Sequence, residues 1–475
     1  MKKTDIGLTN KKKENFSGWY TEVIKKAKLM DYSSVSGGIV ILPNAYFVWQ
    51  KIQDFLNKEF KKIGVKNAYF PSLIPESLLK KEKQHIKGFE PEVAWVTEAG
   101  KTRLSERLAI RPTSETIMYD SFSKWIRSYK DLPLKINQWN NVVRWEFKHP
   151  IPFLRTREFL WQEGHSVFSS KEEADKEVLE IINLYERVYN ELLAIPVLRG
   201  KKTENEKFAG ADYTLSLEAI LPNKKVIQAA TSHNLGQNFS KAFDIVFLDK
   251  NEKEENAWQT SWGFSTRSLG IMIATHADDK GMIFPPKVAP IQVVIIPIFF
   301  EGYKNKILNV AKKVKDKLKE FEVFVDDRED YSAGWKFNEW ELKGIPLRIE
   351  IGPNEIKNKE VLAVRRDNLK KEKIKISKLN SRVKYLLDDI QKELFKRAKK
   401  DFLDSIKRIN SFNEIKTKEN FVFEVCLCNK ISCEKKVNNQ GLKVLILSLD
   451  KNIFNNNCFV CGEKSSFVAY IGKSY

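Results

Sequence analysis

The sequence predicts a multidomain protein of the mixed α/β and α+β classes. Its 475 residues are enough for two to four domains, and its hydrophobic content of 42% is enough for a large core. The pattern of strands and helices changes at a proline-rich stretch, and all five cysteines gather near the end of the sequence. These observations divide the chain into three predicted domains, residues 1–285, 286–378 and 379–475.

The charge of the chain favours a polyanionic partner. Lysine and arginine number 82 against 62 acidic residues, which gives a net charge of +20. Nucleic acid is the first candidate and an anionic membrane the second, and a lysine-rich composition without a specific partner is a further alternative. The start of the sequence has no apolar run typical of a signal peptide, and the most apolar window, 291–300, is too short to span a bilayer. We therefore expect a cytoplasmic protein without a membrane partner.

The first predicted domain combines amphipathic helices with short strands. Helices over 45–64 and 171–194 alternate with apolar runs. In "NVVRWEF" polar and apolar residues alternate strictly, which places Arg144 and Glu146 on one face of a strand. The strand "FLWQEGHSVF" alternates in the same way, and one of its faces carries Trp161, Glu163 and His165. Strands of this kind favour an antiparallel sheet surrounded by helices.

The second predicted domain begins after "DDKGMIFPPKVAP". Beyond this stretch strands and helices alternate, from "QVVIIPIF" through "FEVFVDD" and "PLRIEIG" to "EVLAVRR". The helix between the first two strands has one apolar stripe, formed by Ile307, Val310, Ala311, Val314 and Leu318. The pattern predicts a small α/β domain of about 90 residues.

The third predicted domain consists of a long amphipathic helix and a cysteine-rich tail. The helix carries Leu386, Ile390, Leu394, Ala398 and Phe402 on one stripe. In the tail, four residues separate Cys428 from Cys433, and two separate Cys458 from Cys461. Both gaps suit a structural zinc site with four thiolate ligands, whereas Cys426 is a spare thiol or a competing ligand. Packing of buried thiols is the alternative.

The stretch "RPTSET" over 111–116 has two interpretations. The first is an ordinary helix start, with Thr113 or Ser114 as the N-cap and Thr116 in the first turn. In the second, Thr113 and Glu115 point into a pocket, where a hydroxyl and a carboxylate hold a cation. The residues of this stretch alone leave both open.

A basic loop follows the strand that carries Arg144 and Glu146. The pair could form a salt bridge within the sheet, because buried charges must be satisfied. The loop, however, adds Arg155 and Arg157, and arginines in such a hairpin suit the phosphates of a nucleoside triphosphate.

Two further stretches bring polar residues together. "QAATSHNLGQNFS" contains Gln228, Thr231 and His233, which form part of a site or a polar turn with a satisfied core histidine. "WGFSTRSLGIMIATHADDKG" places Gly263, Ser265 and Arg267 at the opening of an apolar helix. Such a helix start is either an anion site or an ordinary capped helix.

Together these stretches resemble the three motifs of class II aminoacyl-tRNA synthetases. A helix followed by a strand, "NAYFPSLIP" with Pro71, resembles motif 1, Arg144 and Glu146 resemble motif 2, and Arg267 resembles motif 3. The segments "RPTSE", "WQEGHS", "FAGADYT", "QAATSHNLGQNF" and "PPKVAPIQVVIIPI" are similar to the short type of prolyl-tRNA synthetase. The resemblance extends over essentially the whole chain. It implies an antiparallel-sheet catalytic domain, an α/β anticodon-binding domain and a small cysteine-rich domain.

The resemblance also implies the chemistry. The family makes prolyl-adenylate from L-proline and ATP, with Mg²⁺ on the phosphates, and then transfers proline to the 3′ end of tRNA(Pro). Arg144 would hold the α-phosphate and the proline carboxylate, and Arg267 the γ-phosphate side. The other nucleotide contacts that it implies are Glu146, Arg155, Thr156, Phe159, Gln228, Thr231 and Ser265. Thr113 and Glu115 would accept from the proline ammonium. The residues that it implies near the ammonium or around the ring are His233, Phe89, Trp161, His165 and Phe208.

Outside the active site, the resemblance implies four further features. Glu341 and Arg348 match positions that read the guanines of proline anticodons, although a pair of ordinary surface charges is the alternative. The last residue, Tyr475, matches a tyrosine whose carboxylate reaches toward the active site. Motif 1 lies at a dimer interface in this class, so we expect a homodimer. Only about 80 residues separate the motif 2 hairpin from "QAATSHN", so we expect no editing insertion and some activation of alanine or cysteine.

Two rival functions follow from the same sequence. One is a catalytically inactive paralogue that binds RNA or a protein. The other is a synthetase of the same subclass with a different amino acid. The set of intact residues, Thr113, Glu115, Arg144, His233 and Arg267, argues against the first rival. No cysteine precedes Cys426, which excludes the catalytic zinc site that threonyl-tRNA synthetases build with a cysteine ligand.

Overall fold

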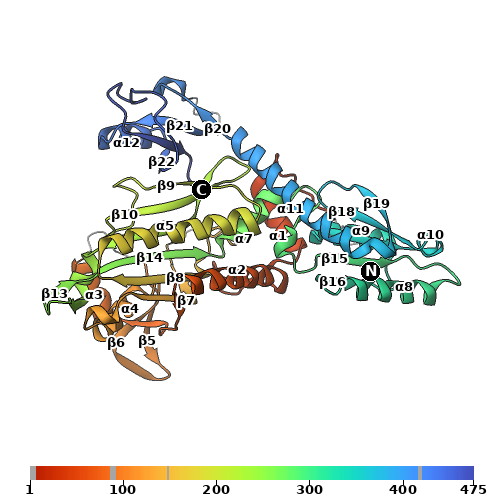
Figure 1. The fold of residues 1–475 in the computed structure, drawn as a ribbon, viewed down its shortest axis with the longest axis horizontal. Helices are drawn as coiled ribbons and strands as arrows, with labels where there is room; N and C mark the ends of the chain where they lie inside the picture. Colours follow the sequence, from red (N-terminus) through yellow and green to blue (C-terminus); the bar gives the residue numbers. More distant parts are fainter. Residues whose placement is uncertain (1–6, 86–91, 147–148, 416–419) are drawn as a thin grey trace.

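The computed structural model describes residues 7–85, 92–146, 149–415 and 420–475. A large sheet with helices packed on it forms one part, a smaller α/β unit forms another, and the strands of the cysteine-rich tail continue the large sheet at one edge (Figure 1). Among the described residues, no helix has the length and apolar character needed to cross a membrane.

Eleven strands form the large sheet, in the order β20-β21-β23-β22-β9-β10-β11-β14-β8-β7-β3. Its long central strands pair antiparallel, as the sequence predicts. They are β7 (Leu134–Val143), β8 (Glu158–Phe168), β10 (Tyr213–Ile220), β11 (Val226–Gly236) and β14 (Trp258–Ser265). The short strands β3 (Lys66–Asn67) and β9 (Leu198–Lys201) flank them. This antiparallel sheet confirms the predicted fold class.

Helices bury apolar stripes against this sheet. One core cluster joins it to α1 (Phe16–Lys26), α2 (Pro43–Lys62), α5 (Lys171–Arg187) and α7 (Arg267–His276). A second cluster joins it to α4 (Glu115–Trp125) and α6 (Asn238–Phe243). Helix α5 begins where the Ser170 hydroxyl accepts from the main-chain N–H of Glu173, and it continues as a π-helical turn over Val188–Leu192. Strand β14 ends at Ser265 and α7 begins at Arg267, so the N-terminus of α7 lies at the end of that strand.

Smaller elements surround the sheet. Two short ladders pair β1 (Met30–Tyr32) with β2 (Ile39–Ile41) and β12 (Val246–Leu248) with β13 (Glu254–Asn256). A three-stranded sheet has the order β4-β6-β5, with β4 (Leu73–Pro75), β5 (Trp95–Ala99) and β6 (Thr102–Ile110), and α3 (Glu76–His85) follows β4. Between Phe168 and Val226 all residues are described, and they form α5, its π-turn, β9 and β10. No inserted domain interrupts the catalytic sheet in this interval.

The strand predicted over "NVVRWEF" is shorter than expected. β7 ends at Val143, so Arg144 and Glu146 follow the strand instead of sharing one of its faces, and Trp145 is exposed. The reason is that the partner strand β8 begins only at Glu158, and the residues between the two strands form the hairpin loop. The main-chain N–H of Arg144 still donates to the oxygen of Arg157 at 2.7 Å, which holds Arg144 at the mouth of the hairpin.

The α/β unit contains a five-stranded sheet in the order β16-β15-β17-β18-β19. Its first three strands are parallel, and the last two are antiparallel additions. The strands are β15 (Val293–Pro297), β16 (Val323–Val325), β17 (Leu347–Ile351), β18 (Glu360–Arg365) and β19 (Lys371–Lys375). The helices are α8 (Lys304–Lys317), α9 (Ala333–Lys343) and α10 (Pro353–Lys357). All four predicted strands and the predicted apolar helix stripe are therefore present.

Close main-chain contacts join the α/β unit to the segment that follows α7. The N–H groups of Met282 and Phe284 donate to the oxygens of Leu342 and Gly344, each at 3.0 Å. Gly344 has a φ of 81°, and a Cβ atom there would lie 2.4 Å from the oxygen of Met282. Only glycine combines this backbone conformation with so close an approach.

Helix α11 (Leu379–Asp404) connects all three parts. Its first turns bury Leu379, Val383 and Leu386 in the core of the α/β unit. Its middle packs Ile390 and Leu394 against a patch of the catalytic domain. In Figure 1 the helix runs from the α/β unit toward the tail.

The tail extends the catalytic sheet. It contains β20 (Ile406–Arg408), β21 (Val422–Leu427), α12 (Ile431–Asn438), β22 (Lys443–Ser448) and β23 (Phe467–Gly472). The strand predicted over "LKVLILSL" is β22, and it pairs with β9 through Leu447 and Lys201. The tail is therefore hydrogen-bonded to the catalytic sheet.

Candidate active site

A cavity of about 450 Å³ lies between the central strands and the N-terminus of α4. The sequence-predicted residues that line it are Thr113, Glu115, Arg144, Glu146, Phe159, Trp161, His165, Phe208, Gln228, Thr231, His233, Ser265 and Arg267. Strand register explains part of this convergence, because Ser261 of β14 stands opposite both His165 of β8 and His233 of β11. Residues opposite one another in neighbouring strands point to the same face of a sheet.

The segment "RPTSET" forms one wall of this cavity. Arg111 is buried and donates to the main-chain oxygens of Asn141 and Phe70, at 2.8 and 2.9 Å, which fixes the segment against β7. Ser114 is the N-cap of α4, so the predicted helix start is present. Glu115 occupies the first turn and, like Thr113, lines the cavity. The helix start and the pocket wall are therefore the same structure.

A buried carboxylate, Glu163, lies beneath this wall. Its Oε2 atom accepts from the hydroxyl of Thr113 at 3.1 Å and from the main-chain N–H of Ser114 at 2.9 Å. Its Oε1 atom accepts from the amide of Asn140 at 2.6 Å. Burial opposes ionisation of Glu163, but hydrogen bonds from His165 and Ser114 outweigh it and lower the pKa of this carboxyl to about 2.

His233 and aromatic rings enclose the next part of the cavity. The Nδ1 atom of His233 lies 2.9 Å from the Thr214 hydroxyl, and the Phe208 ring lies 4.7 Å away between ring centroids. Burial, together with the nearby His165, lowers the pKa of His233 to about 3, so its imidazole is neutral at pH 7. A neutral imidazole adds no positive charge to the cavity.

Two arginines, Arg144 and Arg267, also line the cavity. The Nε atom of Arg144 donates to the oxygen of Pro112 at 3.0 Å, and its guanidinium lies 5.2 Å from the Trp161 ring centroid. Arg267 donates to the oxygens of Leu154 and Gln228, each at 3.1 Å. Burial lowers the pKa of Arg267 to about 10, which still leaves it charged at pH 7. Main-chain anchors of this kind orient both guanidinium groups before any ligand binds.

Among the described residues that the sequence predicts for this pocket, Arg155 and Thr156 do not line the cavity. Arg155 lies in an adjoining cavity of about 170 Å³ and donates to the main-chain oxygen of Tyr475 at 2.5 Å. Gln228 and Arg267 line both cavities, so the cavity that Tyr475 lines adjoins the one that contains Arg267. Thr156 is buried beside Arg155 without reaching either lining. Phe89 lies outside the described residues.

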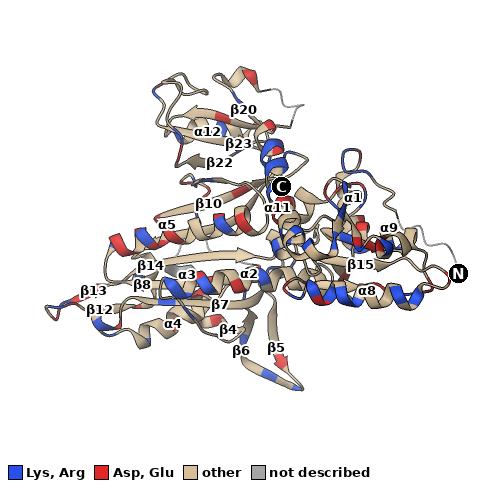
Figure 2. Ribbon diagram, turned by 45° about the vertical axis from the view of Figure 1, so that its right-hand side comes forward, with Lys and Arg blue, Asp and Glu red and all other residues tan. Residues whose placement is uncertain are grey.

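The predicted anticodon residues meet in the α/β unit. Glu341 in α9 and Arg348 in β17 form a salt bridge of 3.0 Å, and Arg348 also bonds Glu350 at 2.9 Å. The ring of Phe337 lies 4.2 Å from the Arg348 guanidinium. The pair is therefore a largely buried, tertiary contact and not two ordinary surface charges. Helices α8 and α11 also carry basic residues, but they pack on the other face of this sheet (Figure 2).

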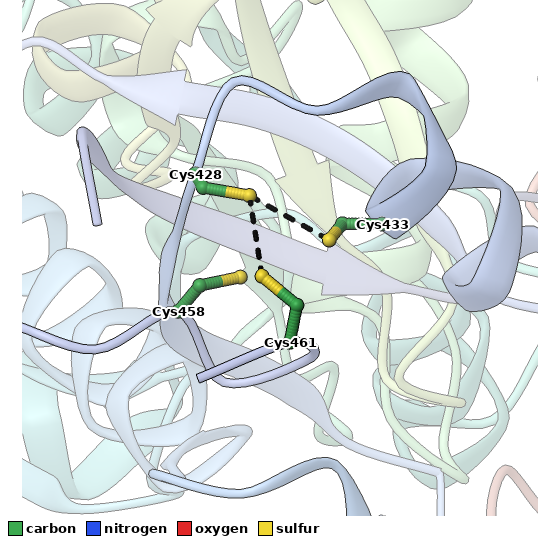
Figure 3. Close-up of side chains that lie close together, drawn as sticks. All are labelled: Cys428, Cys433, Cys458 and Cys461. Carbon is green, nitrogen blue, oxygen red and sulfur yellow. Dashed lines mark hydrogen bonds between the residues drawn. The ribbon is translucent and has the colours of Figure 1, made fainter. Parts of the chain in front are cut away.

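Four cysteines converge in the tail, as Figure 3 shows. The Sγ atoms of Cys428, Cys433, Cys458 and Cys461 all lie within 4.8 Å of one another. Cys428 is 3.5 Å from Cys433 and 3.8 Å from Cys461. Zinc–sulfur bonds of about 2.3 Å in a tetrahedron place sulfur atoms about 3.8 Å apart, so this donor set fits Zn²⁺. Cys426 lies apart, in β21, where its sulfur accepts from the N–H of Asn455 at 3.3 Å.

Comparison with known proteins identifies the family. A model of the tRNA synthetase class II core domain (G, H, P, S and T) matches residues 95–276, and one of the anticodon binding domain matches 292–386. A proline–tRNA ligase of Alkaliphilus oremlandii (strain OhILAs) is 46% identical over 467 residues, which cover 97% of this chain and 96% of the relative. The chain belongs to the proline–tRNA ligase family.

Two further family members extend this result. The "Proline--tRNA ligase, cytoplasmic" of Arabidopsis thaliana is 45% identical and covers 100% of this chain and 92% of its own length. The crystal structure of prolyl-tRNA synthetase from Cryptosporidium parvum, complexed with halofuginone and AMPPNP, matches with a TM-score of 0.95 and 45% identity. The match covers 99% of this chain and 100% of that chain. The proline–tRNA ligase fold therefore extends through the tail as well as the two domains that the family models match.

Sequence reasoning missed four polar residues of the cavity lining, which are Glu163, Glu206, Thr214 and Ser261. Glu163 was recognised only as a neighbour of Trp161 and His165 on one strand face, although it also lines the cavity. Thr214 lies in β10 and contacts His233 from the adjacent strand. The alternation of β8 was the available signal for Glu163, and the segment "FAGADYT", which ends in Thr214, was the available signal for Thr214.

Proposed function

We propose that this chain is an active proline–tRNA ligase, which activates L-proline with ATP and transfers it to tRNA(Pro). The observation that carries the proposal is one cavity with two different ends. Acidic and hydroxyl acceptors, Glu115 and Thr113, stand at one end, with Arg144 anchored beside them on Pro112, and a second anchored arginine, Arg267, lines the part that adjoins the neighbouring cavity. An amino acid and a nucleoside triphosphate need this combination if their reacting groups are to meet.

In this proposal the first end recognises proline. The secondary ammonium of proline has two N–H donors, and a hydroxyl and a carboxylate suit them as acceptors. Thr113 and Glu115 therefore bind the ammonium, with the neutral His233 nearby. The apolar ring fits among aromatic side chains, for which the chain offers Trp161, His165, Phe208 and, beyond the described residues, Phe89.

The second end binds ATP, which enters as its magnesium complex. Arg144 contacts the α-phosphate and the proline carboxylate, and Arg267 contacts the γ-phosphate side. The carboxylate is already ionised at neutral pH, so its attack on the α-phosphorus needs no general base, and pyrophosphate leaves. The arginines stabilise the charge that develops on the phosphate oxygens. We assign the remaining nucleotide contacts to Glu146, Arg155, Thr156, Phe159, Gln228, Thr231 and Ser265.

We further propose that Glu341 and Arg348 read guanines of the proline anticodon. An arginine donates to O6 and N7 of guanine, and a carboxylate accepts from its N–H groups. Because the two side chains pair with each other, tRNA would have to exchange this salt bridge for bonds to the bases. The excess of basic residues supports a polyanionic substrate.

The proposed assembly is a homodimer in the cytoplasm. Tyr69, in the segment that resembles motif 1, is 70% exposed, and Tyr32 and Val40 of the β1–β2 ladder are 54% and 48% exposed. Exposed apolar side chains of this kind support a protein interface. The Arabidopsis relative carries the word cytoplasmic in its name. Light scattering of the purified protein tests the dimer, and Tyr69→Asp should shift it toward monomer.

We propose one structural Zn²⁺ per chain in the tail. Cys428, Cys433, Cys458 and Cys461 would supply four thiolates, which fill a tetrahedral shell and leave no position for a substrate. Zinc would supply binding energy to the folding of the tail and take no part in the reaction.

Amino-acid-dependent ATP–pyrophosphate exchange tests the proposed function. Purified protein is incubated with ATP, labelled pyrophosphate and each candidate amino acid in turn. We expect exchange to be strongest with L-proline and weaker with alanine or cysteine. Exchange with none of them would favour the inactive, RNA- or protein-binding paralogue, and strongest exchange with a different amino acid would favour the second rival.

A further inference from the structure

The buried carboxylate of Glu163 determines which way the Thr113 hydroxyl points. We propose that Glu163 is a positioning residue, which fixes this hydroxyl as a hydrogen-bond acceptor and so selects ligands with N–H donors on the ring. The inference rests on the proposed function, because it concerns how the same cavity recognises its amino acid.

Hydrogen-bond donors surround the Glu163 carboxylate. The Ser114 N–H and the Asn140 amide donate to its two oxygens, at 2.9 and 2.6 Å. The Nε2 atom of His165 lies 3.5 Å from Oε2, and its Nδ1 atom lies 2.9 Å from the Tyr119 hydroxyl. With the proton of His165 on Nε2, both of these contacts are satisfied at once. These donors favour the ionised form of Glu163, in agreement with its pKa of about 2.

An ionised carboxylate accepts hydrogen bonds and donates none. At 3.1 Å, the single proton of the Thr113 hydroxyl must therefore point at Glu163. The main-chain N–H of Glu115 is 3.5 Å from the same hydroxyl oxygen, at the limit of a hydrogen bond. One lone pair of the oxygen remains available to a ligand, so the hydroxyl meets the ligand as an acceptor.

Two acceptors then face the same ligand atom, the Thr113 oxygen and the Glu115 carboxylate. This arrangement matches the two N–H donors of a ring ammonium. It disfavours an analogue of the same shape in which an ether oxygen replaces the ring nitrogen. An ether oxygen has no proton to donate, so the two protein acceptors would face a third acceptor. Oxolane-2-carboxylate, which has oxygen in place of the proline nitrogen, is such an analogue.

Glu163 also contacts the first turn of α4, which offers a purely structural explanation for its presence. The carboxylate caps Ser114, and negative charge at a helix N-terminus is stabilising. If Glu163 had a structural role alone, a Glu163 variant would bind all ligands of the cavity more weakly, and to the same extent. If Glu163 has a positioning role, the variant would lose affinity selectively for a ligand with N–H donors. This difference makes the proposal testable.

The test measures pyrophosphate exchange with L-proline and its inhibition by oxolane-2-carboxylate. It compares wild type, Glu163→Gln, Thr113→Val and the double variant, with Thr113→Ser as the conservative control. For Glu163→Gln we expect the KM for proline to rise about 10-fold or more, the size expected for a hydrogen bond to a charged group. The inhibition constant of the ether should stay the same or fall, because the hydroxyl is then able to donate. Thr113→Ser should keep the preference of the wild type.

Coupling between the two residues gives the second readout. In the Thr113→Val background the hydroxyl is absent, so Glu163→Gln should change the proline KM by less than about threefold. An equal loss of affinity for proline and for the ether, an unchanged proline KM, or fully additive effects would overturn the positioning role. If Glu163→Gln does not fold, Thr113→Val alone must raise the KM for proline and leave the inhibition constant of oxolane-2-carboxylate unchanged. The opposite result overturns the proposal. Wild-type protein that fails to exchange with proline would instead refute the proposed function.

Discussion

The candidate proline pocket and the cysteine cluster belong to the same eleven-stranded sheet, yet different structures hold them in place. The pocket residues lie on long central strands and a helix start, and main-chain groups or buried side chains anchor them. Cys433 lies in the short helix α12, whereas Cys428, Cys458 and Cys461 lie outside the regular elements. Their sulfur atoms contact one another.

This difference separates two kinds of function. The fold orders the pocket before a substrate binds, so a change in the pocket should alter chemistry and leave the fold intact. The cysteine cluster brings four thiols together, and a metal would stabilise them as thiolates. A change there should alter the fold of the tail and leave chemistry largely intact.

Among the proposed variants, Glu115→Gln should reduce proline activation most severely. The variant keeps the size of the side chain and removes the charge that faces the proline ammonium. We expect a loss of about 2–5 kcal/mol of transition-state stabilisation, or roughly 30-fold to several thousand-fold in kcat/KM for proline. Pyrophosphate exchange measures this loss, and circular dichroism should show an unchanged fold.

Glu172→Gln, at the exposed start of α5, is the matched control and should behave like wild type. Near-normal proline-dependent exchange by Glu115→Gln would refute the assignment of Glu115 to the ammonium.

Arg348→Ala extends the comparison to the α/β unit, which is remote from both clusters. We expect tRNA charging to weaken by about 1–3 kcal/mol, the range for one base-reading arginine, while tRNA-free exchange stays unchanged. Removal of Arg348 also leaves Glu341 and Glu350 without this partner, so the thermal stability of the variant is measured alongside. An equal fall in exchange and in charging would contradict the separation of roles.

Cys428→Ser should have the converse effect of Glu115→Gln. We expect metal analysis to give about one zinc per wild-type chain and less than about 0.2 per variant chain. The variant tail should become sensitive to protease, while proline-dependent exchange changes only a few-fold, through the contact between Arg155 and Tyr475.

Cys426→Ser is the matched control, because Cys426 lies apart from the four-sulfur group. It should retain both zinc and protease resistance. Zinc-free wild-type protein with an equally resistant tail would assign these cysteines to packing instead.

The smallest expected effect concerns two buried histidines, which should not titrate near neutral pH. Burial lowers the pKa values of His233 and His276 to about 3, so both imidazoles should stay neutral between pH 5 and 8. In the unfolded chain they bind protons below about pH 6.5, so their contribution to stability is complete above that pH and decreases as the pH falls toward 3. Only five histidines are present, which makes an NMR titration of selectively labelled protein practical. A midpoint near 6.5 for His233 would contradict its burial beside the proline site.

The sequence predicted which segments form helices and strands better than it predicted which strands pair with one another. The alternation of β8 and the apolar stripe of α8 follow from side-chain periods of two and 3.6 residues, so both were predictable from local patterns. The early end of β7 was not, because it depends on where β8 begins to pair. The pairing of β9 with β22 joins residues about 250 positions apart, and no local pattern records such a contact.

The same distinction applies to the candidate site. The family resemblance of their segments marked Thr113, Glu115, Arg144 and Arg267 as ligand-binding residues, and the structure brings them to one cavity. The role of Glu163 depends on a contact with Thr113, which is 50 residues away. A buried charge acquires its role from its hydrogen-bond partners, and those are known only once the chain is folded.

A crystal structure with a non-hydrolysable prolyl-adenylate analogue tests the central claim most directly. The account predicts that the ring nitrogen lies about 2.7–3.2 Å from both the Thr113 Oγ1 atom and a carboxylate oxygen of Glu115, with the phosphate-like group within reach of Arg144. It also predicts that the Thr113 hydroxyl keeps its contact with Glu163. A ring nitrogen turned away from Thr113 and Glu115, with well-defined density for the analogue, would contradict it.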